Sequence, residues 1–157
     1  MRKYAWIAAL VVATDQLVKA LARQLNETFV LIPGVLAFTY AENTGMAFSL
    51  FSGRPWLLGL LSAAAICFGW LILLRYRLGA LSRVAAMLML GGAVGNMLDR
   101  LLAGYVVDMF EVLLFRFAIF NVADAALTAG CLLMAISLLT KPGDWSERSN
   151  GSKRESV

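Results

Sequence analysis

Four long apolar stretches follow one another along the chain, at about residues 4–22, 56–74, 84–98 and 117–139. A helix needs about 20 apolar residues to cross the hydrocarbon core of a bilayer. The first stretch also resembles the apolar core of a secretory signal, but the pattern resumes after residue 17 and three more stretches follow. The pattern therefore predicts an all-α membrane protein with four transmembrane helices in one domain, residues 1–141, and a polar, disordered tail, residues 142–157.

Positive charge marks one side of this predicted bundle. Cytoplasmic loops of membrane proteins carry an excess of lysine and arginine, so basic clusters indicate the cytoplasmic side. Both termini are therefore expected in the cytoplasm, and residues 23–55 and 99–116 on the outer side. The basic residues that carry this prediction are Arg2, Lys3, Arg75, Arg77, Arg83, Lys141, Arg148, Lys153 and Arg154.

The outward segment between the first two spans does not have the composition of a simple solvated loop. Residues 29–32 and 35–40 are largely apolar and rich in β-branched or aromatic side chains, and they flank Pro33 and Gly34. Proline followed by glycine suits the central positions of a type II turn. We expect a small β-hairpin or cradle at the membrane interface here, followed by a short interfacial piece at residues 44–51.

Composition supports the membrane assignment and removes several chemistries. The chain is 61% hydrophobic and 15% charged, against about 45–50% apolar residues in a soluble domain. Its net charge is +4, but the basic residues are scattered and not interleaved with aromatics, so nucleic acid is not an expected partner. There is no histidine, which excludes Ser-His and Cys-His catalysis. Cys67 and Cys131 lie singly in apolar stretches and are expected to be buried spectators, and no metal or cofactor is expected.

Two spacings predict contacts between the helices. Asp15 and Lys19 lie four residues apart in the first span, where they can neutralise each other and lower the cost of charge in hydrocarbon. A structural role is expected for this pair. Gly91 and Gly95 have the small-xxx-small spacing that lets helix backbones approach closely.

Most other polar groups gather between the end of the third span and the start of the fourth, at one level near the outer leaflet. Polar groups at membrane depth are candidates for function, because each must find a partner. Structural alternatives stay open: a helix-end ion pair for Asp99 and Arg100, and interhelical hydrogen bonds for the asparagines. The cluster consists of Asn96, Asp99, Arg100, Asp108, Glu111, Asn121 and Asp124.

Asp108 and Asp124 differ from the other acids because neither has a cation at helical spacing. Two carboxylates in a poorly hydrated site cannot both ionise, and such a pair can hydrolyse a bond without metal or histidine. The same residue types would also suit a magnesium-dependent lipid phosphotransferase that uses Asp99, Asp108 and Asp124 as ligands. A proton or ion carrier with Asp15 and Lys19 as its relay is a third possibility.

At this point the sequence resembles the bacterial lipoprotein signal peptidases, or signal peptidase II. Each matching stretch alone is weak, but together they appear in family order from the first span into the fourth. The stretches are Thr14-Asp15-Gln16 with Lys19, Asn43-Thr44-Gly45 with Ala47-Phe48, Gly91-Gly92, Gly95-Asn96, Asp99-Arg100, Gly104 with Val106-Val107-Asp108, and Phe120-Asn121-Val122-Ala123-Asp124.

The resemblance implies an aspartyl endopeptidase with Asp108 and Asp124 as its catalytic pair. Its substrates would be diacylglyceryl-modified prolipoproteins, cut just before the lipidated cysteine at the outer face of the bacterial cytoplasmic membrane. Membrane lipids would surround a monomer that needs no cofactor, and globomycin-type peptides would inhibit it. Met109 stands where many members of the family have an aromatic residue. This difference would change the shape of one wall of the pocket. The remaining matched positions are Asn43, Gly45, Asn96, Arg100 and Asn121 around the site, with Asp15 and Asp99 in support.

Overall fold

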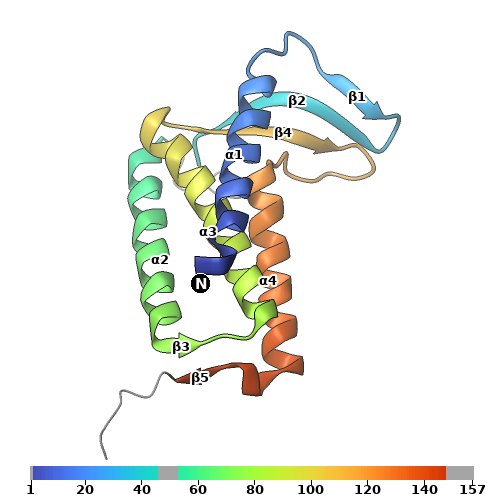
Figure 1. Cartoon of the computed structure of the whole chain (residues 1–157). Coiled ribbons are helices and arrows are strands. Elements are labelled where there is room, and N and C mark those ends of the chain that lie inside the picture. Colours follow the sequence, from blue (N-terminus) through green and yellow to red (C-terminus); the bar gives the residue numbers. More distant parts are fainter. Residues whose placement is uncertain (1, 46–52, 148–157) are drawn as a thin grey trace, which may run out of the picture.

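Four long helices dominate the computed structural model, which describes residues 2–45 and 53–147. They run roughly alongside one another, with a small sheet at one end of the bundle (Figure 1). Each helix is long and apolar enough to cross a membrane, which confirms the four predicted spans. The helices are α1 (Ala5–Ala22), α2 (Pro55–Arg75), α3 (Ala80–Leu102) and α4 (Val122–Thr140).

The start of α4 differs from the prediction. The apolar stretch begins near residue 117, but the helix begins at Val122, because Asn121 caps it. The Asn121 side chain accepts a hydrogen bond from the backbone of Asp124 at 2.9 Å, and the Asp124 side chain accepts one from the backbone of Asn121 at 3.3 Å. This reciprocal arrangement is a capping box. Phe120, just before the capping box, forms a β-bridge with Phe110 in extended chain. Apolarity alone does not distinguish such an extended segment from a helix.

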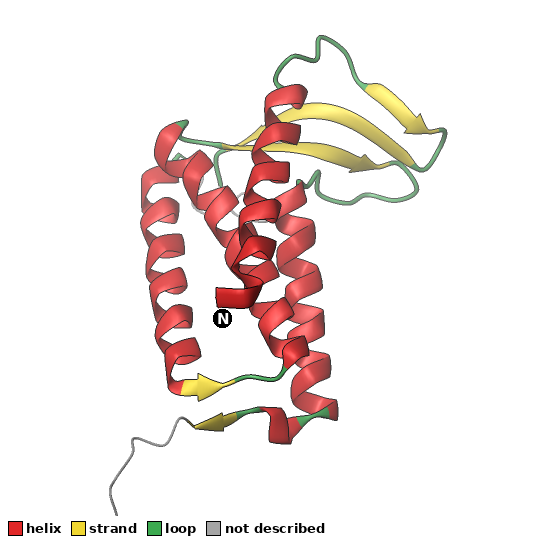
Figure 2. Ribbon diagram, in the orientation of Figure 1, coloured by secondary structure: helices red, strands yellow, loops and turns green. Residues whose placement is uncertain are grey.

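A three-stranded antiparallel sheet covers one end of the bundle (Figure 2). It contains β1 (Phe29–Ile32), β2 (Leu36–Asn43) and β4 (Val106–Val112), in the order β1-β2-β4. The predicted hairpin is confirmed as β1 and β2. Its turn has Gly34 at φ +69° and a hydrogen bond of 3.0 Å from the Val35 nitrogen to the Ile32 oxygen.

Strand β4 is an addition to the prediction, which places residues 99–116 on the outer side without a strand. It pairs with β2 over a long sequence separation, with Ala41 opposite Asp108 and Asn43 opposite Val106. The expectation of an all-α protein with one hairpin is therefore incomplete. The sheet draws its third strand from the segment between α3 and α4.

Glycines of α3 face α1, as their spacing predicted. A Cβ atom on Gly91 would lie 2.7 Å from Cβ of Val11, and one on Gly95 would lie 2.7 Å from Oδ2 of Asp15. No side chain fits at either position without moving a neighbour. The two helices therefore pack backbone to backbone, and Asp15 lies directly against α3.

Many large apolar side chains point outward from the helices and from β1. Phe68 of α2 is 66% exposed, and every residue of β1 is exposed. In a bilayer these side chains contact lipid. Cys67 and Cys131 are free but exposed on this outer surface, so the expectation that they are buried was wrong: each lies on the lipid side of its helix.

The end of the bundle opposite the three-stranded sheet carries a short second ladder (Figure 1). Strand β3 (Tyr76–Arg77) pairs with β5 (Ser146–Glu147), which follows a 3-10 turn, η3 (Pro142–Asp144). Residues 142–147 are thus ordered, not part of a disordered tail as expected, because this ladder holds them. The expectations for residues 148–157, and for most of the interfacial piece at 44–51, lie outside the described residues.

Candidate active site

A buried polar network lies where the three-stranded sheet meets α1, α3 and α4. Its members come from segments far apart in the sequence, and all are less than a tenth exposed. Buried polar groups are costly unless they are hydrogen-bonded, and here they bond mainly to one another. These residues are Asp15, Lys19, Asn96, Asp99, Asp108 and Asn121.

Asp108 lies on β4 and is 3% exposed. Both of its carboxylate oxygens accept hydrogen bonds from amides: Oδ2 from Asn43 at 3.0 Å and Oδ1 from Asn121 at 2.6 Å. Asn43 reaches it because the two residues are diagonal neighbours across β2 and β4, on one face of the sheet. Met109 points to the other face and packs with Ala22 and Val107, so it belongs to the core beneath the sheet.

Asp124 occupies the third position of α4, in the capping box. Its Oδ1 accepts a hydrogen bond of 2.7 Å from the amide of Asn96 on α3. Its Oδ2 accepts the backbone N–H of Asn121. The start of a helix favours a negative charge, so the cap and the helix dipole both position this carboxylate.

Asn121 connects the two acids. Its Nδ2 donates to Asp108 at 2.6 Å and to Oδ1 of Asn96 at 3.2 Å, while its backbone donates to Asp124. Asn96 in turn donates to Asp124. The structure therefore brings Asp108, Asp124, Asn96 and Asn121 into one network, as the clustering in the sequence suggested.

The surroundings of Asp108 favour its protonated form. Burial, the largest cause, and the nearby charge of Asp124 raise the pKa of Asp108, while the donations from Asn43 and Asn121 lower it; the result is a pKa of about 6. A carboxyl group with this pKa exchanges its proton near neutral pH. That property suits a group that works as acid and base in turn.

A fully buried lysine stands behind the two acids. Nζ of Lys19 lies 2.7 Å from Asp15, 2.8 Å from Asp99 and 3.0 Å from Oδ1 of Asn96. The predicted contact between Asp15 and Lys19 is confirmed. The alternative of a helix-end pair between Asp99 and Arg100 was wrong, because Asp99 turns toward α1 and pairs with Lys19. Asp15 also accepts the backbone N–H of Ala123 at 2.9 Å, which joins α1 to the start of α4.

Gln16 belongs to this support, although the sequence assigned it no role. Its side-chain amide donates to Asp99 at 3.0 Å and to the backbone oxygen of Gly95 at 3.3 Å. Asp99 also accepts the backbone N–H of Val107 on β4 at 3.3 Å. The available signals were its position beside Asp15 and its place in the stretch Thr14-Asp15-Gln16 that matches the family, and a contact with α3 cannot be deduced from either.

Arg100 and Gly45 lie at the edge of the network. The Arg100 guanidinium donates to the Gly45 oxygen at 3.3 Å, and the Gly45 nitrogen donates to Oδ1 of Asn43 at 3.0 Å. Nε of Arg100 is buried and has no hydrogen-bond partner among residues 2–45 and 53–147. Ala47 and Phe48, which complete this stretch of the sequence, lie outside the described residues.

The arrangement of these residues bears on the two alternative functions, a magnesium-dependent lipid phosphotransferase and a proton or ion carrier. Asp99 is held by Lys19, Gln16 and Val107 and does not join Asp108 and Asp124 as a third ligand. Within the described part of the chain, no three His, Cys, Asp or Glu residues are grouped so that they could hold a metal ion. Asp15 and Lys19 are fully buried and tied to three helices, which favours a structural role over a relay.

Comparison with known proteins gives consistent matches over most of the chain. The family model for signal peptidase (SPase) II matches residues 7–140. The chain is 41% identical to a lipoprotein signal peptidase of Trichormus variabilis over 149 residues, which cover 92% of this chain and 94% of that protein. A lipoprotein signal peptidase of Streptococcus agalactiae is 37% identical over 150 residues, with 93% and 94% covered.

Two solved structures also match this chain over most of its length. One bacterial membrane enzyme matches with a TM-score of 0.82 and 28% identity, over 100% of this chain and 96% of that one. A second matches with a TM-score of 0.79 and 30% identity, over 90% and 95% of the two chains.

Proposed function

This chain belongs to the signal peptidase II family, and we propose that it is an aspartyl endopeptidase with Asp108 and Asp124 as its catalytic pair. It removes signal peptides from diacylglyceryl-modified prolipoproteins and cuts just before the lipidated cysteine. The observation that carries the proposal is the hydrogen-bonded link through Asn121 between two acids from separate elements. The chain contains no histidine, so general acid and base catalysis is left to carboxylates or lysine, and the buried Lys19 is already paired with Asp15 and Asp99.

The two carboxyl groups share one proton and exchange roles during the reaction. The ionised member takes a proton from a water molecule, which attacks the scissile carbonyl carbon. The protonated member donates its proton to the carbonyl oxygen. As the tetrahedral intermediate collapses, the C–N bond breaks and the proton gained from water passes to the leaving amine nitrogen. The hydroxyl proton on the former carbonyl oxygen returns to the carboxylate that donated it, so the pair regains its starting state.

The surrounding amides and burial act on Asp108 in opposite directions. Asn43 and Asn121 donate to Asp108, and Asn96 donates to Asp124, so each carboxylate has a donor when it is ionised. Burial opposes ionisation of Asp108. The balance between donors and burial leaves the pKa of Asp108 at about 6, so this carboxyl can carry the proton below that pH and release it above.

The position of the pair relative to the membrane selects the bond. Asp124 lies in the first turn of α4 and Asp108 on the sheet beside it, so both lie at one end of the spanning helices. At the other end are the basic residues Arg75, Arg77 and Lys141. By the positive-inside rule that end faces the cytoplasm, and the acids face the outer, periplasmic side of the bacterial cytoplasmic membrane.

Substrates reach the pair by lateral diffusion. A prolipoprotein carries a spanning signal segment and acyl chains, so it is already confined to the bilayer that surrounds this protein. The exposed apolar residues of β1 support a position of the sheet against the outer interface. The enzyme works there as a monomer, and globomycin-type peptides inhibit it by occupying the same site.

The test is cleavage of a synthetic diacylglyceryl precursor by the purified full-length chain in lipid nanodiscs, followed by gel shift. Asp108→Asn or Asp124→Asn should each lower the rate by at least about 10²–10⁴-fold, the usual contribution of general acid or base catalysis. Glu111→Gln is the matched control, an acid on the same strand that should keep full activity.

Two further arms separate the proposal from its alternatives. An unlipidated precursor should not be cut, and EDTA should have no effect, whereas a magnesium-dependent phosphotransferase would lose its activity. Undiminished cleavage by either aspartate variant would overturn the catalytic assignment.

A further inference from the structure

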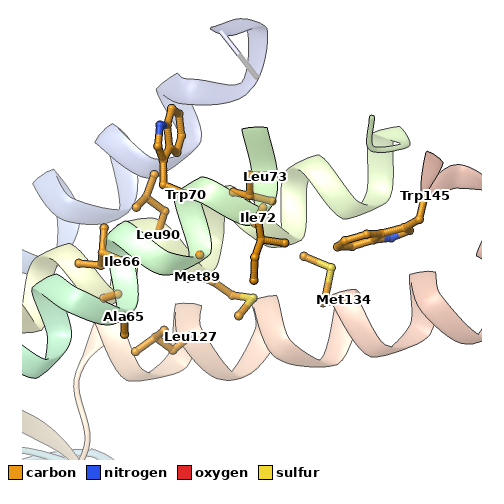
Figure 3. Close-up of a pocket in the computed structure, with 13 residues that line it drawn as sticks. Ala65, Ile66, Trp70, Ile72, Leu73, Met89, Leu90, Leu127, Met134 and Trp145 are labelled. Carbon is orange, nitrogen blue, oxygen red and sulfur yellow. The ribbon is translucent and has the colours of Figure 1, made fainter. Parts of the chain in front are cut away.

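An apolar cavity of about 330 Å³ lies between α2, α3 and α4 (Figure 3). Its lining consists of apolar side chains and one glycine, among them Ala65, Leu73, Met134 and Trp145. Apart from the indole N–H groups of Trp70 and Trp145, the lining side chains carry no hydrogen-bonding group. A molecule without polar groups is therefore the suitable occupant, since an unpaired polar group would be costly here.

This cavity continues toward the active site. A second cavity of about 300 Å³ is lined by Leu58, Leu61, Ser62, Ala65 and Arg100, and Ala65 belongs to both. The hydroxyl of Ser62 is already satisfied by the Leu58 oxygen at 2.9 Å. Arg100 holds Gly45, which bonds to Asn43 beside Asp108. An apolar path therefore runs along α2 from the edge of the site.

Trp145 closes the far end of this path. Its indole N–H donates to the Ser82 hydroxyl at 2.9 Å, and Ser82 is hydrogen-bonded to Ser137 at 2.7 Å. Its ring lies 5.8 Å from that of Tyr76, beside the β3–β5 ladder. Figure 3 shows the indole at one end of the cavity, with Ala65 and Leu127 toward the other. The polar atom of Trp145 is thus used by the protein, and its ring forms an end wall.

The dimensions fit a single hydrocarbon chain. From Leu58 to Leu73 the path follows 15 residues of α2, which is about 22 Å at 1.5 Å per residue. An extended chain advances about 1.2 Å per bond, so a chain of about 18 carbons covers roughly 20 Å. A peptide helix is about 10–12 Å wide, and two turns of it displace on the order of 900 Å³, more than both cavities hold.

We propose that this path receives one acyl chain of the lipid-modified substrate and that Trp145 limits the length of the chain. The inference rests on the proposed function and deepens it, since it makes acyl length a determinant of specificity. Charge also disfavours the signal segment as occupant, because Arg77 lies at the Trp145 end, where it repels the positively charged start of such a segment.

Kinetics with precursors of defined acyl length test the proposal. The full-length enzyme in phosphatidylethanolamine and phosphatidylglycerol nanodiscs is given precursors with chains of about 8, 16 or 20 carbons. Ala65 lies seven residues from Leu58 on α2, so a chain of about 8 carbons ends near it. Ala65→Phe should raise KM about tenfold for 16-carbon substrates and far less for 8-carbon ones. Ala64→Phe, on the same helix but outside the lining of both cavities, is the matched control and should change neither.

Trp145 is tested in the opposite direction. Trp145→Ala should raise kcat/KM for the 20-carbon substrate about tenfold relative to the 16-carbon one. Trp145→Phe keeps a ring as the wall and should retain the wild-type profile. Transfer of an acyl chain from water would change affinity roughly fourfold per methylene group. The changes in KM and kcat/KM expected here are far smaller, because the acyl chain enters the path from lipid, which is equally apolar.

A photolabel locates the chain without relying on cleavage. A 16-carbon chain with a terminal diazirine, bound to the inactive Asp124→Asn variant, should label Ile72, Met134 or Trp145. Labelling only of outward residues such as Phe68 would overturn the inference. An increase in KM for Ala65→Phe that is equal for all chain lengths would also overturn the inference, because it would indicate that the signal segment occupies the path.

The outcomes also separate this inference from the proposed function. If the wild-type enzyme cleaves lipidated precursors without any dependence on chain length, a bilayer phospholipid tail fills the path and only this inference fails. If the wild-type enzyme cleaves no lipidated precursor, the proposed function fails.

Discussion

Asn121 joins the cap of α4 to the carboxylate of Asp108, so replacing it separates the two tasks. Its oxygen accepts the backbone N–H of Asp124 at 2.9 Å, and its nitrogen donates to Asp108 at 2.6 Å. Asn121→Ser keeps a side-chain oxygen for the cap but is too short to reach Asp108. Asn121→Ala removes both contacts.

The magnitudes follow from these contacts. A hydrogen bond to a charged group contributes about 1.5–3 kcal/mol, and one pKa unit corresponds to about 1.4 kcal/mol. Donation from Asn121 lowers the pKa of Asp108, which stands at about 6. Its loss should raise that pKa by roughly 1–2 units in both variants. Loss of the cap should cost Asn121→Ala a further ~1 kcal/mol of stability that Asn121→Ser retains.

The assay is the pH dependence of kcat/KM for precursor cleavage in nanodiscs, from about pH 4 to 9, with thermal unfolding of the same samples. The limb of the pH profile that depends on the ionisation of Asp108 should move to higher pH by roughly 1–2 pH units in both variants. Only Asn121→Ala should unfold at a clearly lower temperature. A pH profile of Asn121→Ser that superimposes on the wild type would refute the reasoning.

Three further predictions concern stability in detergent, measured by thermal unfolding. The pKa of Asp108 in the folded state is raised from 3.8 to about 6, so ionisation of this group opposes folding at higher pH. Asp108→Asn should therefore stabilise the protein by up to about 3 kcal/mol at pH 8. This gain in stability should fade as the pH falls from about 6 to 4. A gain independent of pH would contradict this. Lys19→Met leaves Asp15 and Asp99 buried without their cation and should cost about 3–5 kcal/mol, while the exposed Lys3→Met should be neutral; equal Tm values would exclude the ion cluster as a source of stability. Gly91→Ala should cost about 1–3 kcal/mol through its clash with Val11, whereas Gly69→Ala, with open space around it, should not destabilise; similar losses in both would point to backbone effects instead.

The helices could be predicted from the sequence because each apolar stretch approaches the thickness of a bilayer, a local property. The hairpin could be predicted from Pro33 and Gly34 for the same reason. Strand β4 could not, because its conformation depends on pairing with β2 more than sixty residues earlier. The start of α4 was misplaced because a side-chain cap, and not hydrophobicity, ends the extended segment before it.

The candidate site was partly visible for similar reasons. Asp108 and Asp124 stood out because neither had a cation at helical spacing, and the structure links both to Asn121. Periodicity revealed the contact of Lys19 with Asp15 on its own helix. The contacts of Lys19 with Asp99 and Asn96 on α3 depend on how the helices pack, which spacing within one helix does not encode. Asn43 entered only through the family resemblance.

The attachment of Asp124 to the first turn of α4 ties the reaction to bilayer thickness. This helix has 19 residues, a length of about 28 Å, close to the roughly 30 Å of an average hydrocarbon core. In lipids with much longer tails, α4 would be too short for the hydrocarbon core, and the mismatch would draw the acids below the headgroups or thin the bilayer around the protein. Peptide hydrolysis should therefore respond to the choice of lipid even when the protein and its precursor are unchanged.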